Sequence, residues 1–237
     1  MPSPSAQEIR AAMRAMSDAQ IAAHSSRFFK TGKGEYGEGD RFLGIRVPKI
    51  RGVARRFRSA SLQTTERLLA SPYHEERLLA VIILVEKFRQ GGETEREAIH
   101  RLYTLNLHRI NGWDIVDISA PAIIGGFLEL RDRSPLYEWA RSSIMWERRI
   151  SIMATFHFIR QRDFSDALAI TEILLHDNED LIHKAVGWML REIGNRDRAV
   201  EENYLKIHAG AMPRTMLRYA IEKFSPPLRN AYLIGRR

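Results

Sequence analysis

The strongest constraint on the fold is the spacing of apolar residues, which recur every three or four positions along most of the chain. That spacing places them on one face of an α-helix. The alternation of apolar and polar residues that is typical of strands is scarce. Turn-forming residues separate stretches of about 10–16 residues, which is a normal helix length. The sequence therefore predicts an all-α protein.

Four segments of the chain resemble one another, because each sets a polar or basic residue just before a dense apolar run. Arg77, Arg149 and Lys184 occupy comparable positions, 72 and 35 residues apart, and Trp113 lies midway between the first two. A helical repeat of about 35 residues is near the tetratricopeptide and HEAT range. Stacked repeats align equivalent positions along one face, so these residues are expected to be neighbours. The segments are HEERLLAVIILVEKF, WERRISIMATFHFIR, LIHKAVGWMLREIG and PRTMLRYAIEKFSP.

No long linker interrupts the chain, so we expect a single domain over residues 1–237. It would comprise an N-terminal helical cap (1–30), a glycine-rich loop (31–47) and helical repeats (48–237). Three glycines of the loop match the spacing of a dinucleotide-binding fingerprint, which needs a strand before it and a helix opening at it. Neither is evident, and the nearby carboxylates would repel a pyrophosphate. We therefore interpret this segment as a flexible loop. The glycines are Gly32, Gly34 and Gly37.

The balance of charges favours a polyanionic partner. There are 37 lysines and arginines against 29 acidic residues, which gives a formal net charge of +8. Nucleic acid is the first expectation for such a chain, and a generic basic surface is the alternative. Pro48 suits the first turn of a helix that is rich in arginine. We predict that Lys49 and Arg51 of this helix contact phosphates, and a solvated basic helix is the other interpretation.

Other classes of site are not indicated. The chain has no cysteine, which excludes disulfides and thiolate zinc sites and fits a reducing cytoplasm. The eight histidines do not cluster at metal-ligand spacings, so neither a metal nor a small-molecule cofactor is expected. The longest apolar run, LLAVIILV, is far shorter than the roughly 20 residues of a membrane span. We expect a cytoplasmic monomer that does not enter membranes.

Two pairs of residues are the best candidates for a site. Trp113 and Asp117 are four residues apart, so on a helix they share a face. Arg149 follows one repeat later and is expected beside Asp117. A structural ion pair and a catalytic carboxylate beside a phosphate-binding arginine both fit that pairing. Lys184 and Trp188 form a second pair, and two indoles would attract a cation, although a tryptophan also fits core packing.

Four segments resemble signature segments of the AlkD-type DNA glycosylases, the DNA alkylation repair enzymes built of HEAT-like repeats. They are FLGIRVP, NGWDIVD, the W-x-x-R that ends at Arg149, and KAVGWMLRE. The resemblance covers roughly residues 25–225, in the order of the family. It implies a HEAT-like helical-repeat solenoid with a concave basic groove. It also implies excision of 3-methyladenine and 7-methylguanine type lesions from double-stranded DNA, held in the duplex, in base excision repair.

The resemblance also assigns roles to single residues. Asp117 matches the catalytic acidic residue, and Arg149 matches the arginine that supports it and contacts the DNA backbone. Trp113 and Trp188 match the aromatic contacts. Arg148 is the other possible register for the arginine. We also assign Lys184 and Arg148 to DNA binding.

Two other functions remain open at this point. One is a non-catalytic protein that binds damaged or branched DNA. Asp117 is an argument against it, because binding alone would not need a carboxylate in a phosphate-rich groove. The other is a protein-interaction scaffold, which predicts an apolar or acidic groove instead of a basic one.

Overall fold

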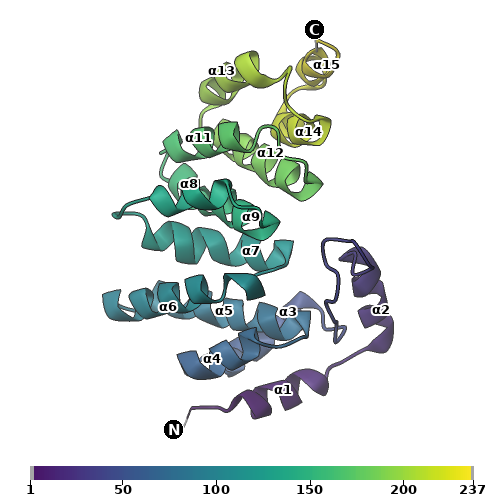
Figure 1. Ribbon diagram of the computed structural model, residues 1–237, viewed down its shortest axis with the longest axis vertical. Helices are drawn as coiled ribbons and strands as arrows, with labels where there is room; N and C mark the ends of the chain where they lie inside the picture. The colour runs from purple at the N-terminus through teal and green to yellow at the C-terminus, as the bar shows by residue number, and fades with distance from the viewer. Residues whose placement is uncertain (1–2, 236–237) are drawn as a thin grey trace. The chain divides into compact units, whose positions relative to one another are not determined.

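The computed structural model describes residues 3–235, and within that range it is built from helices, turns and loops, with one isolated bridge between Arg41 and Tyr73 (Figure 1). The prediction of an all-α fold is confirmed. None of the described helices is long and apolar enough to cross a membrane. The α-helices are α1 (Ala6–Arg14), α2 (Ala19–Phe28), α3 (Val47–Arg56), α4 (Leu62–Leu69), α5 (His74–Gln90), α6 (Glu93–Leu105), α7 (Trp113–Ser119), α8 (Ser134–Ala140), α9 (Met145–Ala154), α10 (Phe156–Arg160), α11 (Ser165–Ile173), α12 (Asp180–Gly194), α13 (Arg198–His208), α14 (Arg214–Ala220) and α15 (Pro226–Ile234).

Three short elements complete the chain. They are the 3-10 helices η1 (Leu107–Arg109) and η3 (Ile221–Lys223) and the π-helix η2 (Ala120–Gly125), which continues directly from α7. Contacts between residues divide the chain into an N-terminal unit, Met1–Ile123, and a C-terminal unit, Ile124–Arg237.

The predicted repeat is visible in the helix boundaries. Helices α5, α7, α9, α12 and α14 begin at intervals of 39, 32, 35 and 34 residues. Asp117, Arg149 and Lys184 are each the fifth residue of their helix, and Arg77 is the fourth of α5. Asp117, Arg149 and Lys184 therefore hold equivalent positions in the repeat, whereas Trp113 lies one turn earlier.

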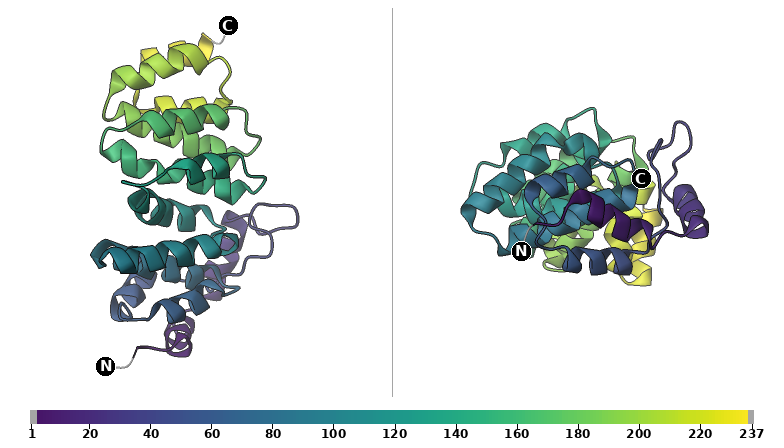
Figure 2. Two further views of the ribbon diagram at one scale, coloured as in Figure 1. Left: turned by 60° about the vertical axis from the view of Figure 1, so that its left-hand side comes forward. Right: turned by 90° about the horizontal axis from the view of Figure 1, so that it is seen from below.

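Helix α5 is the centre of the N-terminal unit. Its residues 74–85 are all buried, because α3, α4, α6 and α7 pack around it. This explains its near-continuous apolar sequence, since a helix covered on all sides has no polar face. Helix α2 has no buried residue, and the three views of Figures 1 and 2 show it with the following loop at the edge of this unit.

The segment after α2 is held by close backbone contacts. Gly44 has a φ of +78°, and a Cβ at this position would lie 2.0 Å from the carbonyl oxygen of Asp18. Only glycine combines that conformation with that approach. The N–H of Asp18 in turn donates to the carbonyl of Leu43 at 2.9 Å. The glycine in FLGIRVP thus joins the start of α2 to the chain that enters α3.

Helix α12 is the centre of the C-terminal unit and packs against α9, α11, α13 and α14. It approaches α14 closely at Gly187, where a Cβ would lie 2.4 Å from the carbonyl oxygen of Met216. The glycine of KAVGWMLRE is therefore a contact between two helices. Trp188, which follows it, is half-buried.

Candidate nucleic-acid interface

Helix α7 carries two of the predicted site residues. Ile115 and Val116 are fully buried and pack the helix against α5, while Trp113 and Asp117 on another face are half-buried. Burial explains a strong rise of the pKa of the nearby Tyr103 hydroxyl, and the negative charge of Asp117 adds to it. Asp117 thus lies at the edge of the core with its side chain partly open to solvent.

Trp113 belongs to an aromatic cluster at the start of α7. Its indole stacks on the ring of Phe29, with centroids 5.3 Å apart and planes 9° from parallel. Phe28, which is 59% exposed, meets it edge to face at 6.1 Å. Phe29 and Phe42 also contact the ring of His74, at 4.7 and 4.8 Å. One indole face is therefore covered by the segment that follows α2.

His74, the first residue of α5, lies between two carboxylates. Its Nδ1 is 2.8 Å from Asp40 Oδ2, and its Nε2 is 2.9 Å from Asp114 Oδ2. Arg77 donates to the same oxygen of Asp40 at 2.9 Å. Burial by itself lowers the pKa of His74, but hydrogen bonds and charges from Asp114 and Asp40 outweigh burial and raise the pKa to about 9. The ring is therefore an imidazolium at neutral pH, and its charge and that of Arg77 balance the two carboxylates.

Glu75 holds the FLGIRVP segment from the next position. Its carboxylate accepts hydrogen bonds from the backbone N–H groups of Leu43, Gly44 and Ile45, at 2.8, 2.8 and 3.2 Å. A buried carboxylate needs such donors to offset the loss of water. The start of α5 thus fixes the chain before α3 and, through His74, the start of α7.

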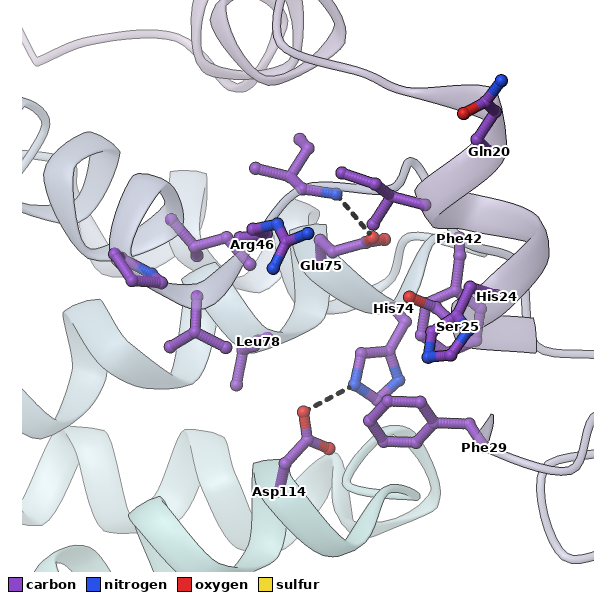
Figure 3. Close-up of a pocket in the computed structure, with 15 residues that line it drawn as sticks. Gln20, His24, Ser25, Phe29, Phe42, Arg46, His74, Glu75, Leu78 and Asp114 are labelled. Atoms are coloured by element: carbon purple, nitrogen blue, oxygen red, sulfur yellow. Dashed lines mark hydrogen bonds and ion pairs between the residues drawn. The ribbon is translucent and has the colours of Figure 1, made fainter. Parts of the chain in front are cut away.

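A cleft of about 690 Å³ opens beside this cluster, between α2, α3 and the start of α5. Figure 3 shows Asp114 reaching from α7 to the ring of His74, with Phe29 lying against that ring. The opposite wall is mainly apolar and includes Leu78 and Ile50, and Arg46 lies at the N-terminus of α3. The cleft lies within the N-terminal unit.

In the C-terminal unit, the neighbouring arginines Arg148 and Arg149 of α9 differ in their hydrogen-bond partners. The guanidinium of Arg148 is occupied by Asp177, with Nε 2.6 Å from Oδ2, and it also donates to the carbonyls of Ser142 and Ser143. Arg149 is only 4% exposed, and its Nη1 donates to the carbonyl of Leu181. Arg148 therefore braces the loop before α12, and Arg149 is at the repeat position that matches Asp117.

The remaining predicted contacts lie on α12 and α3. The indole N–H of Trp188 donates to Glu192 at 3.2 Å, and Phe156 lies 6.2 Å from its ring. Lys184 forms an ion pair with Asp180 at 2.8 Å, one turn earlier on α12. Lys49 and Arg51 are exposed on α3, where solvated phosphates can reach them. Among the described residues, no group of three or more His, Cys, Asp or Glu side chains is arranged to hold a metal ion.

Sequence reasoning missed His74, Asp40, Asp114 and Glu75. Their partners lie 30 to 40 positions away in the chain, so no local spacing connects them. One signal was present: Asp114 lies inside NGWDIVD and Asp40 lies two residues before FLGIRVP, and both segments were singled out for other residues. Gly112 carries a second signal, because a Cβ there would lie 2.9 Å from His74 Cε1.

Comparisons with known proteins agree with this architecture. A solved structure described as a "Predicted DNA alkylation repair enzyme from Enterococcus faecalis" superposes with a TM-score of 0.69 at 16% sequence identity. The match covers 89% of this chain and 98% of that one, and it shows a shared fold. No curated protein matches the chain. A family model described as DNA alkylation repair enzyme matches residues 9–224, so the chain belongs to the family of DNA alkylation repair enzymes.

Proposed function

We propose that this protein is a DNA glycosylase that excises cationic alkylated purines, of the 3-methyladenine and 7-methylguanine type, from duplex DNA in base excision repair. The observation that carries the proposal is the placement of Asp117. It follows Trp113 by one turn on α7, half-buried, inside a segment that resembles the glycosylase signature. A carboxylate beside a partly open aromatic face suits a positively charged substrate.

The chemistry needs no general acid. A purine alkylated at N3 or N7 carries a positive charge, so it takes the electron pair of the N-glycosidic bond and leaves as a neutral base. Positive charge then develops on the deoxyribose, and a water molecule adds to C1′ and releases a proton. Asp117 would stabilise that developing charge more than it stabilises the ground state, which is the condition for a faster reaction.

Other residues would bind the DNA. Trp113 is half-buried beside the exposed ring of Phe28. In the C-terminal unit, the resemblance assigns Arg149 to the DNA backbone and Trp188 to an aromatic contact, and we also assign Lys184 to DNA binding.

The direct test is release of 7-methylguanine from methylated duplex DNA under single-turnover conditions. We expect Asp117→Asn to slow release tenfold or more, equivalent to about 1.4 kcal/mol of barrier, while DNA affinity stays within about threefold. The replacement keeps the shape of the side chain and removes its charge. Asp132→Asn, in the exposed turn before α8, is the matched control and should release the base at the wild-type rate.

Equal release by wild type and Asp117→Asn would contradict the catalytic assignment. DNA binding by a wild type that releases no base would instead favour a non-catalytic damage-binding protein.

A further inference from the structure

The start of α7 depends on contacts from outside the helix. Its N-cap residue, Gly112, has no side chain to accept the free N–H groups of the first turn. The first turn therefore lacks a side-chain cap. The segments that pack against α7 therefore set the orientation of Trp113 and Asp117. In the first turn of α7, Asp114 makes a buried ionic contact with His74.

That contact is one half of a clamp formed by Asp40, His74 and Asp114. The ring of His74 is 2% exposed, and the side chains of Asp40 and Asp114 are 7% and 16% exposed. A neutral imidazole has one N–H and could donate to only one of the two carboxylates. Because both ring nitrogens lie within 2.9 Å of a carboxylate oxygen, the geometry favours a ring that carries both protons.

The clamp joins three segments that are distant in sequence. Asp40 lies in the glycine-rich loop, His74 begins α5 and Asp114 lies in the first turn of α7. The rings of Phe29 and Phe42 contact the imidazolium, and Phe29 also stacks on Trp113. Gly112 approaches the same ring so closely that a side chain would collide with it. Moving His74 would therefore disturb both the indole of Trp113 and the rotation of α7 about its axis.

We propose that His74 is a positioning residue for excision, which acts through Asp114 and Phe29 to hold Trp113 and Asp117 of α7 in the orientation that the reaction needs. The inference rests on the proposed glycosylase function. The proposal also gives the glycine-rich loop a role, because the loop supplies Asp40. Arg77 of α5 is the second partner of Asp40 and fixes the loop to that helix.

The first test uses two substitutions of His74. His74→Gln keeps an amide donor for one carboxylate, but it removes the charge and turns an acceptor oxygen toward the other. We expect it to slow single-turnover release at pH 7.5 tenfold or more, with DNA affinity within threefold. His74→Arg keeps a positive charge, and its guanidinium has several N–H donors and stacks well on aromatic rings. We therefore expect its rate of release to lie within about threefold of the wild-type rate. His100→Gln, a half-buried histidine of α6 outside the clamp, is the matched control and should behave as wild type.

The second test uses pH. The charged groups that face His74 are Asp40, Asp114 and Arg77, with Glu75 beside it. The pKa of His74 is about 9, so its ring loses its charge as the pH rises through that value. The ratio of wild-type to His74→Arg rates on one substrate should therefore fall as pH rises through 9, and ionisation of the DNA cancels in that ratio.

The clamp is overturned by release from His74→Gln within twofold of wild type, or by a rate ratio that stays constant from pH 7 to 10. If the wild type releases no base, the proposed glycosylase function is contradicted. The clamp is then tested on its own, by amide hydrogen exchange. Faster exchange over residues 115–119 in His74→Gln supports it, and equal exchange overturns it. Asp114→Asn tests the same contact if His74→Gln does not fold.

Discussion

Glu201 is a buried acid with no role in the proposed chemistry. It is 2% exposed in the first turn of α13, and its Oε1 has no hydrogen-bond partner among the described residues. Burial raises its pKa to about 8, with Glu202 adding to the rise and Arg198 opposing it. The folded state therefore keeps a proton that the unfolded chain loses near pH 4.5, so this residue makes stability fall between pH 4.5 and 8.

We expect Glu201→Gln to remove that loss, because the amide has nearly the same shape and no charge to desolvate. The variant should match wild type near pH 4.5 and exceed it at pH 8, by on the order of 2 kcal/mol in the free energy of unfolding. Urea unfolding at both pH values measures this difference. Glu202→Gln, whose partly exposed side chain pairs with Arg198, is the control and should change stability by less than about 0.5 kcal/mol. Parallel pH profiles for wild type and Glu201→Gln would contradict the expectation.

The residues of the site differ in how far the sequence could reveal them. Trp113 and Asp117 share a face because of their spacing, which the sequence shows directly. The choice of Arg149 over Arg148 stays a prediction: Arg148 is paired with Asp177, and Arg149 is buried at the repeat position. His74 could not be predicted, because its function depends on two carboxylates that only the folded chain brings to it.

At the scale of helices, the contact between α12 and α14 leads to a prediction about Gly187. A methyl group there would lie 2.4 Å from the carbonyl oxygen of Met216 and 2.5 Å from Tyr219 Cβ, so the helices must separate to accept it. Overpacking of this kind costs about 1–3 kcal/mol, which exceeds the gain of up to about 1 kcal/mol in helix propensity. We expect Gly187→Ala to lower the unfolding temperature and, by shifting α12, to weaken DNA binding through Trp188.

Gly210→Ala is the matched control, because a Cβ at Gly210 meets nothing within 4 Å. Thermal unfolding of both variants by circular dichroism makes the comparison. A Gly187→Ala protein as stable as Gly210→Ala would mean that α12 and α14 adjust to each other without cost.

The sequence predicted the helices and their period well, because apolar spacing and turn residues act locally. Pro48, for example, lies in the first turn of α3 as expected. The position of α2 was not predictable, since none of its residues is buried and its sequence therefore carries little information about what it contacts. The same is true of the loop after it, which depends on Glu75 and His74 instead of on a pattern of its own.

For the whole molecule, the relevant quantity is the charge that remains available to DNA. The formal net charge of +8 is read from the sequence, but it does not show which lysines and arginines are already paired with carboxylates in the folded chain. Arg77 and Arg148 are engaged by Asp40 and Asp177, whereas Lys49 and Arg51 are exposed. Composition could therefore indicate a polyanionic partner, and only the folded chain could show which basic residues are free of buried partners.

This division predicts how binding responds to salt. Each phosphate that a lysine or arginine neutralises releases counterions, and a protein that contacts about six phosphates loses roughly 1,000-fold in affinity between 50 and 200 mM salt. We expect a loss of this size for duplex DNA, measured by fluorescence anisotropy. The double variant Lys49→Gln/Arg51→Gln should reduce the slope of log K against log salt by about 2, whereas Lys206→Gln, an exposed change on α13 outside the predicted contacts, should leave it unchanged. An affinity that stays constant over this range would argue against DNA as the ligand, and an unchanged slope in the double variant would remove α3 from the interface.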